Sequence, residues 1–119
     1  MPLSIVVRAV INGAEEQLFQ LKIIQELQHK YNDFSRLHKE LPYFTMEVIY
    51  HIRYEMAKTV EDVLARRTRA LFLNAKVALE IAPKVATIMA HELKKDASWI
   101  TLELNAFRAI AQHYLPGKI

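Results

Sequence analysis

The fold is decided by residues 47–75, EVIYHIRYEMAKTVEDVLARRTRALFLNA, which combine the densest charge pattern of the chain with a regular apolar pattern. Apolar side chains recur at helical spacing in the first half of this stretch, at Val48, Ile49, Ile52 and Met56. Such spacing predicts a helix. Thr59 then offers a hydroxyl N-cap for a second helix, with Asp62 three residues further on, close to a capping box. Two consecutive helices are therefore expected.

Three arginines, Arg66, Arg67 and Arg69, follow the expected cap. The apolar face continues through Val60, Val63, Leu64 and Leu71, and Arg67 falls on it. Because a charge on an apolar face needs a partner, Arg67 is expected to be the most buried of the three and paired with Glu55 or Asp62.

Two interpretations of the arginine cluster stay open. In the first, which is favoured, the arginines form a structural ion-pair network with Glu55, Glu61 and Asp62, in which Asp62 and Arg66 are an i,i+4 pair. In the second, Arg66, Arg67 and Arg69 form a patch for an anion or an acidic partner, because guanidinium groups suit phosphate and carboxylate.

The chain resembles a known family on three sets of residues. They are LPY at 41–43, the run RYEMAKTVEDVLARRTRALFLNA at 53–75, and then Ala82, Pro83, Met89, Glu92, Leu93 and Trp99 in the family's order. Over residues 37–115, about two thirds of the chain, the sequence resembles the C-terminal helical domain of the FAD-dependent (aerobic) glycerol-3-phosphate dehydrogenases and the related alpha-glycerophosphate oxidases. Two departures concern local helix caps: Asn74 stands where the family commonly has an acid, and no glycine follows Leu93.

The resemblance implies a role beside a flavoenzyme. The parent protein would oxidise glycerol 3-phosphate to dihydroxyacetone phosphate and pass electrons to FAD, then to a quinone or oxygen. This domain would cap or brace the flavin and substrate domains of its own parent chain. FAD would belong to the parent, and no catalytic, cofactor-binding or metal residue is assigned here, so the chain alone is expected to be inactive. A cytoplasmic location is expected, at the membrane surface through the parent.

Composition favours an all-α fold. Of the 119 residues, 52% are hydrophobic, 24% are charged and only two are glycine, a balance typical of a helical globular protein. We expect a compact bundle of about five helices. Residues 1–13 would be an extended N-terminal segment or linker remnant, and residues 14–119 the helical domain. The absence of cysteine excludes disulfides and thiolate metal sites.

The net charge of +3 does not indicate a nucleic-acid-binding protein. Basic and acidic residues alternate along the chain, whereas a nucleic-acid-binding surface gathers basic residues on one face. No apolar run reaches the roughly 20 residues that a membrane-spanning helix needs. The first residues also lack the pattern of a signal peptide.

The first half of the chain contains one strand-like segment. Residues 4–11, SIVVRAVI, read as a short strand without a second strand to pair with. They could pair with another copy of the chain as a homo-oligomer, fold into the first helix, or be a linker remnant. A helix is expected over residues 14–31 and a connection over residues 32–45, with Thr45 as the cap of the helix that follows.

The second half carries two further expectations. Pro83 must end a helix or begin another, and the first turn of a helix suits proline, so a new helix is expected there. Ser98 is expected to cap a last helix over residues 99–115. The apolar residues of this helix cover more than one face, which predicts a central place in the core.

No motif for phosphate or metal binding is present. The sequence lacks a GxGxxG turn and a Walker loop, and its histidines, at positions 29, 38, 51, 91 and 113, lack metal-ligand spacing. The alternative function is a stand-alone helical interaction module that binds an acidic partner through the arginine cluster. A large exposed apolar patch would instead favour a domain of a longer protein.

Overall fold

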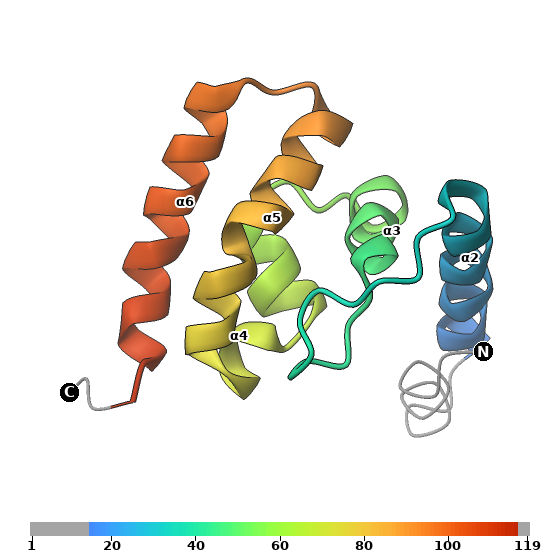
Figure 1. The fold of residues 1–119 in the computed structure, drawn as a ribbon, viewed down its shortest axis with the longest axis horizontal. Helices are drawn as coiled ribbons and strands as arrows, with labels where there is room; N and C mark the ends of the chain where they lie inside the picture. The colour runs from blue at the N-terminus through green and yellow to red at the C-terminus, as the bar shows by residue number, and fades with distance from the viewer. Residues whose placement is uncertain (1–14, 117–119) are drawn as a thin grey trace. The chain divides into compact units, whose positions relative to one another are not determined.

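The computed structural model of the protein describes residues 15–116. Regular structure in this range is helical, apart from one isolated antiparallel bridge between Arg36 and Phe44 (Figure 1). The all-α class is therefore confirmed. The strand expected over residues 4–11 lies outside the described residues, as does the expected boundary at residues 13 and 14, so both stay predictions.

The chain divides into two compact units, Met1–Tyr50 and His51–Ile119. The first described element of the first unit is the helix α2, Glu15–Tyr31, as the apolar periodicity predicts. Its buried face carries Leu21, Ile24 and Leu27, which recur at intervals of three residues. Asn32 ends the helix in the left-handed conformation, with φ at 49°.

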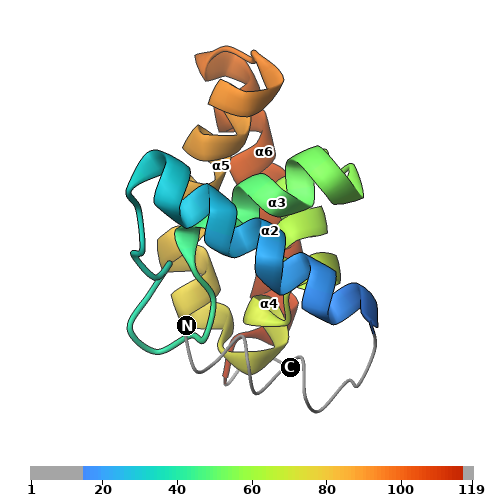
Figure 2. The ribbon, with the colours of Figure 1, turned by 90° about the vertical axis from the view of Figure 1, so that its right-hand side faces the viewer.

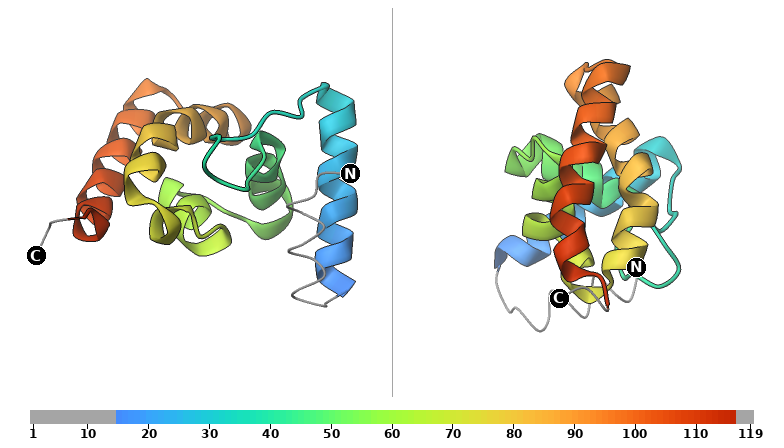
Figure 3. Two further views of the ribbon diagram at one scale, coloured as in Figure 1. Left: turned by 60° about the horizontal axis from the view of Figure 1, so that its bottom comes forward. Right: turned by 90° about the vertical axis from the view of Figure 1, so that its left-hand side faces the viewer.

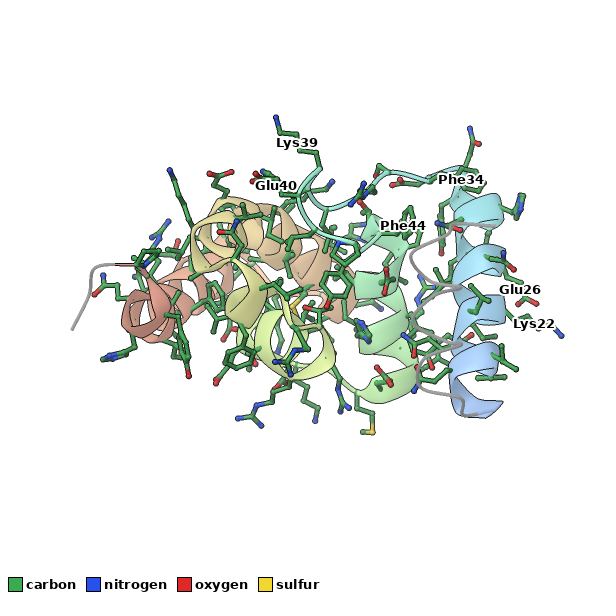
Figure 4. The ribbon with its side chains drawn as sticks, turned by 90° about the horizontal axis from the view of Figure 1, so that it is seen from below. Lys22, Glu26, Phe34, Lys39, Glu40 and Phe44 are labelled. Atoms are coloured by element: carbon green, nitrogen blue, oxygen red, sulfur yellow. The ribbon has the colours of Figure 1, made fainter. Side chains whose placement is uncertain are left out.

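A connection that contains the Arg36–Phe44 bridge joins α2 to the helix α3, Thr45–Glu55 (Figure 2). Two backbone bonds close it into a narrow loop: Leu37 N–H donates to the Tyr43 carbonyl at 2.9 Å, and Thr45 N–H donates to the Ser35 carbonyl at 2.8 Å. Leu41 and Tyr43 are buried, so two of the three residues of the LPY motif pack in the core. Lys39 and Glu40 lie at the outer edge of this loop (Figure 4).

The cap of α3 differs from the expectation. The Glu47 carboxylate accepts the backbone N–H of Phe44 at 2.7 Å, which is one half of a capping box. Thr45 is not the cap, because it is already the first helical residue and its hydroxyl pairs with the hydroxyl of Ser35 at 2.8 Å. Met56 then ends α3 with a positive φ of 58° and is exposed, although the apolar stripe predicted it on the buried face.

The second unit contains four further helical elements and a final 3-10 turn. They are the π-helical segment η1 at Asp62–Arg67, α4 at Ala70–Leu73, α5 at Ala75–Leu93, α6 at Ala97–Ala111, and the 3-10 turn η2 at Gln112–Tyr114. Helices α5 and α6 run side by side after a tight turn (Figure 3). Lys94 supplies the left-handed residue of that turn, with φ at 57°, in the place where glycine is usual.

Helix α5 corrects the expectation at Pro83. The helix runs through Pro83 without a break, although proline removes one helical hydrogen bond and costs about 3 kcal/mol inside a helix. Small and branched side chains on one face of α5 are buried along its whole length, including Ala82 and Val85 on either side of the proline. This burial offsets the local cost, and the proline itself faces solvent. Asn74 caps α5, its side-chain oxygen accepting the N–H of Val77 at 3.1 Å.

Helix α6 corrects two expectations. Its N-cap is Asp96, which accepts the N–H of Trp99 at 3.0 Å; Ser98 is already inside the first turn. The helix is also not central to the core, because only Phe107 and Ala111 are buried in it, while Leu102 is 68% exposed. An apolar composition all round a helix predicts burial only where neighbours cover every side. No helix in the described part of the chain is long and apolar enough to cross a membrane.

Candidate functional site

The best-defined polar cluster surrounds the start of η1. Thr59 and Asp62 form a reciprocal capping box: Asp62 N–H donates to the Thr59 hydroxyl at 3.0 Å, and Thr59 N–H donates to the Asp62 carboxylate at 3.1 Å. The same carboxylate accepts the N–H of Lys58 at 3.0 Å. The cap predicted from the sequence is thus confirmed. Burial opposes the ionised form of Asp62, but the backbone donors of Lys58 and Thr59 outweigh it and lower the pKa of Asp62.

A distant carboxylate completes this cap. Val60 is buried, and its N–H donates to Glu103 of α6 at 2.9 Å across 43 positions of sequence. Without this acceptor the N–H would be a buried donor at a helix start. Sequence reasoning missed Glu103, although one signal was present: it is the only acidic residue of α6.

The π-helical turn decides which side chains of the arginine segment are buried. Val63 and Leu64 are buried, and the next buried residue is Thr68, whose N–H and hydroxyl both donate to the Val63 carbonyl. A π-helical turn closes over five residues and so shifts the following side chains relative to an α-helical stripe. Arg66 and Arg67 consequently point to solvent.

The place of Arg67 on the apolar stripe predicted that it is the buried member of an ion pair, and this prediction is wrong. Arg67 is exposed, and its guanidinium Nη2 donates to the backbone carbonyl of Glu55 at 3.0 Å. The Glu55 carboxylate instead lies 2.5 Å from Nδ1 of the buried His51, one helical turn earlier. The hydrogen bond with His51 lowers the pKa of Glu55, burial opposes this, and the positive charge of Arg67 adds a smaller lowering.

The other two arginines have different surroundings. Arg66 is 69% exposed and lies 3.8 Å from Asp62 and 4.0 Å from Glu61, so the predicted i,i+4 pair is present at the surface. Arg69 lies after the π-helical turn, with its guanidinium over the ring of Phe72 at 5.7 Å. Among the five predicted site residues, Arg67 contacts the Glu55 carbonyl and Arg66 lies near the Asp62 carboxylate, while the Arg69 guanidinium lies over the Phe72 ring.

A two-point ion pair of the second unit, between Arg53 and Glu92, was not predicted. Arg53 at the end of α3 binds Glu92 near the end of α5 through two hydrogen bonds, Nε to Oε1 at 2.7 Å and Nη2 to Oε2 at 3.2 Å. This two-point contact is the main cause that lowers the pKa of Glu92, against a partial burial that raises it. Both residues lie among those that carry the family resemblance, which is the signal that could have pointed to them.

These polar groups make their contacts within the second unit. The described part of the chain holds no group of three or more histidine, aspartate or glutamate residues that could bind a metal ion. The polar contacts described above join helix starts, helix ends and side chains within the unit.

Comparison with known proteins adds the following similarities. A sequence model of the family described as the C-terminal domain of alpha-glycerophosphate oxidase matches residues 13–99. The chain is 45% identical over 72 residues to the probable mitochondrial glycerol-3-phosphate dehydrogenase of Caenorhabditis elegans, covering 60% of this chain and 9% of that protein. It is 42% identical over 73 residues to the mitochondrial glycerol-3-phosphate dehydrogenase of Bos taurus, covering 61% and 10%.

A more distant relative shows the same pattern of coverage. The probable mitochondrial glycerol-3-phosphate dehydrogenase of Dictyostelium discoideum is 37% identical over 75 residues, covering 63% of this chain and 12% of that protein. The chain thus matches only about a tenth of the length of these relatives. No solved structure matches it.

Proposed function

Because this chain belongs to the family of the C-terminal domain of alpha-glycerophosphate oxidase, we propose that it braces the flavin and substrate domains of an FAD-dependent glycerol-3-phosphate dehydrogenase. The observation that carries the proposal is the family match over residues 13–99, which spans most of the chain. The three relatives named above, all glycerol-3-phosphate dehydrogenases, support it. The full-length parent would oxidise glycerol 3-phosphate to dihydroxyacetone phosphate.

In this proposal FAD and the reacting groups belong to the parent. The polar groups of the second unit already make structural contacts. Asp62 and Glu103 accept backbone N–H groups at the start of η1, and the ion pair of Arg53 and Glu92 joins α3 to α5. Such a network suits a rigid brace better than a reaction centre, because a catalytic group must be available to the substrate. The partners are then the flavin and substrate domains of the parent chain, and the location is that of the parent.

Two measurements test the proposal. The purified chain alone should show no flavin absorbance and no glycerol-3-phosphate dehydrogenase activity. Mixed with the flavin-containing remainder of the Caenorhabditis elegans relative, produced without the segment that this chain matches, it should co-elute in size-exclusion chromatography. Stoichiometric flavin in the purified chain alone would contradict the assignment of FAD to the parent. Absence of co-elution with a folded, flavin-loaded remainder would contradict the bracing role.

The cytoplasmic location and the homo-oligomer through residues 4–11 are separate proposals. The names of the relatives place those proteins in mitochondria. Sedimentation velocity of the chain with and without residues 1–13 tests the oligomer. A concentration-dependent dimer that is lost on truncation supports pairing through this segment.

A further inference from the structure

Helix α6 carries an apolar stripe that is largely exposed in the described part of the chain. The stripe consists of Trp99, Leu102, Ala106 and Ala109, which follow one another at intervals of three, four and three residues; it is called here the α6 stripe. Leu102 is 68% exposed, Ala106 and Ala109 are exposed, and Trp99 is half-buried. Intervals of three and four residues place side chains in one row along a helix, and such a row is what packs against a second helix.

The α6 stripe is separate from the face of the helix that packs within its unit. The buried residues of α6 are Phe107 and Ala111, and the helix runs beside α5 (Figure 1). At 3.6 residues per turn, Leu102 lies about 140° and Ala109 about 160° around the helix from Phe107. The other exposed flank of α6 is polar and carries Thr101, Asn105, Arg108 and Gln112.

The charges of α6 lie away from the stripe. Glu103 accepts the N–H of Val60, and Arg108 lies on the polar flank, where it donates to Asn105 at 3.4 Å. Because the stripe is uncharged, two copies of it can meet without bringing like charges together. A helix that lies on a membrane surface is instead rich in lysine and arginine on its polar face, and α6 has one basic residue.

The α6 stripe is also complementary to itself in shape. Its first half carries the large side chains of Trp99 and Leu102, and its second half carries the small Ala106 and Ala109. When two such helices run antiparallel about a two-fold axis, Leu102 of one copy lies against Ala106 of the other, and Trp99 lies against Ala109. Large side chains then fill the space beside small ones, and each contact occurs twice. A parallel pair would instead place the two tryptophans against each other and leave alanine against alanine.

We propose that the chain forms an antiparallel homodimer in which the α6 stripes of two copies pack on each other. The inference goes beyond the proposed function, because bracing the parent requires no second copy. A contact between two helices of 15 residues is smaller than the roughly 1,200 Å² of a standard stable interface. The dimer should therefore be weak, with a dissociation constant of about 10–100 µM.

Sedimentation equilibrium of the full chain at about 5–500 µM measures this association. Leu102→Glu and Ala106→Glu should each weaken the dimer by about tenfold or more, because each substitution places two carboxylates in the contact. Thr101→Glu is the matched control: it adds the same charge on the polar flank and should change the dissociation constant by less than about twofold. All three positions are exposed, so the variants should fold, which circular dichroism and melting temperature verify.

Cysteine cross-linking tests the antiparallel orientation and is independent of any pairing through residues 4–11. The chain has no cysteine, so a Leu102→Cys chain mixed with an Ala106→Cys chain can form disulfides only between the introduced sites. The disulfide between the two different chains should exceed the share that random pairing gives. A Thr101→Cys chain mixed with an Asn105→Cys chain has the same spacing on the polar flank, and should cross-link much more slowly.

Four results would overturn the proposal. The first is a full chain that stays monomeric up to about 500 µM. The second is a Leu102→Glu variant that dimerises as strongly as the wild type, and the third is a mixed disulfide at or below the random share. The fourth is a monomeric wild type in which Leu102→Glu abolishes co-elution with the flavin-containing remainder, or binding to vesicles of phosphatidylcholine and phosphatidylglycerol, because the parent or a lipid surface would then cover the stripe.

Discussion

Asp62 offers the sharpest test of the cap at the start of η1. Its carboxylate accepts two backbone N–H groups, from Lys58 and Thr59, and lies 3.8 Å from the exposed guanidinium of Arg66. Loss of a cap costs about 0.5–2 kcal/mol, and bonds to a charged acceptor lie at the upper end of the hydrogen-bond range. The exposed ion pair adds about 0–1 kcal/mol. We therefore expect Asp62→Ala to lower the unfolding free energy by about 2 kcal/mol, a fall in melting temperature of about 5–10 °C.

Arg66→Ala is the control that separates the cap from the ion pair, and it should cost less than about 1 kcal/mol. Thermal and urea unfolding measure both variants. The pH dependence provides a second check, because the folded-state pKa of Asp62 is lowered. A lowered pKa stabilises the fold above the unfolded-state pKa, and this contribution is lost as the pH falls through the folded-state value. The difference between wild type and Asp62→Asn should then shrink below pH ~4. Equal losses of unfolding free energy for Asp62→Ala and Arg66→Ala would refute the assignment of the stabilisation to the cap.

Three other substitutions follow from the second unit. In a double-mutant cycle, Arg53→Ala and Glu92→Ala should show a coupling energy of about 1–2 kcal/mol, because their two-point contact is partly buried. A coupling energy near zero would show that this contact stabilises no more than an ordinary surface ion pair. Glu103→Leu should cost about 1–3 kcal/mol by stranding the N–H of Val60, whereas Glu103→Gln, which keeps an acceptor, should cost less. Pro83→Ala should raise the melting temperature, since the exposed proline can be replaced without leaving a cavity and a helical hydrogen bond returns; a lower melting temperature would show that the proline is required.

Local signals in the sequence were enough for several elements. The period of apolar residues placed α2 and the body of α3, and the pair of Thr59 and Asp62 indicated the cap that the structure contains. These features depend on residues within one or two turns of each other, so the information needed to predict them lies in a short window. The family resemblance rested likewise on continuous runs, LPY at 41–43 and the motif at 53–75.

Where the sequence analysis predicted the wrong N-cap or helix boundary, the chain offered a second local arrangement that is also favourable. Asp96 and Ser98 are both good N-caps two residues apart, and Glu47 caps α3 through the backbone of Phe44. A proline can begin a helix or sit inside one, and Pro83 is tolerated inside because the opposite face of α5 is buried. In such cases propensity ranks the options, and packing chooses among them.

The amino-acid sequence by itself determined the helical class, the helices α2 and α3 and the family, because each follows from the order and spacing of nearby residues. Tertiary structure alone decided the contacts of Glu103 with Val60, of Arg53 with Glu92 and of Phe72 with Tyr114, since each joins residues about 40 positions apart. It also decided where the Arg67 side chain lies. Because η1 is π-helical, this side chain is off the apolar stripe and exposed to solvent. An ideal helical period cannot anticipate this shift, because the choice between four and five residues per closed turn depends on how Val63, Leu64 and Thr68 pack in the folded unit.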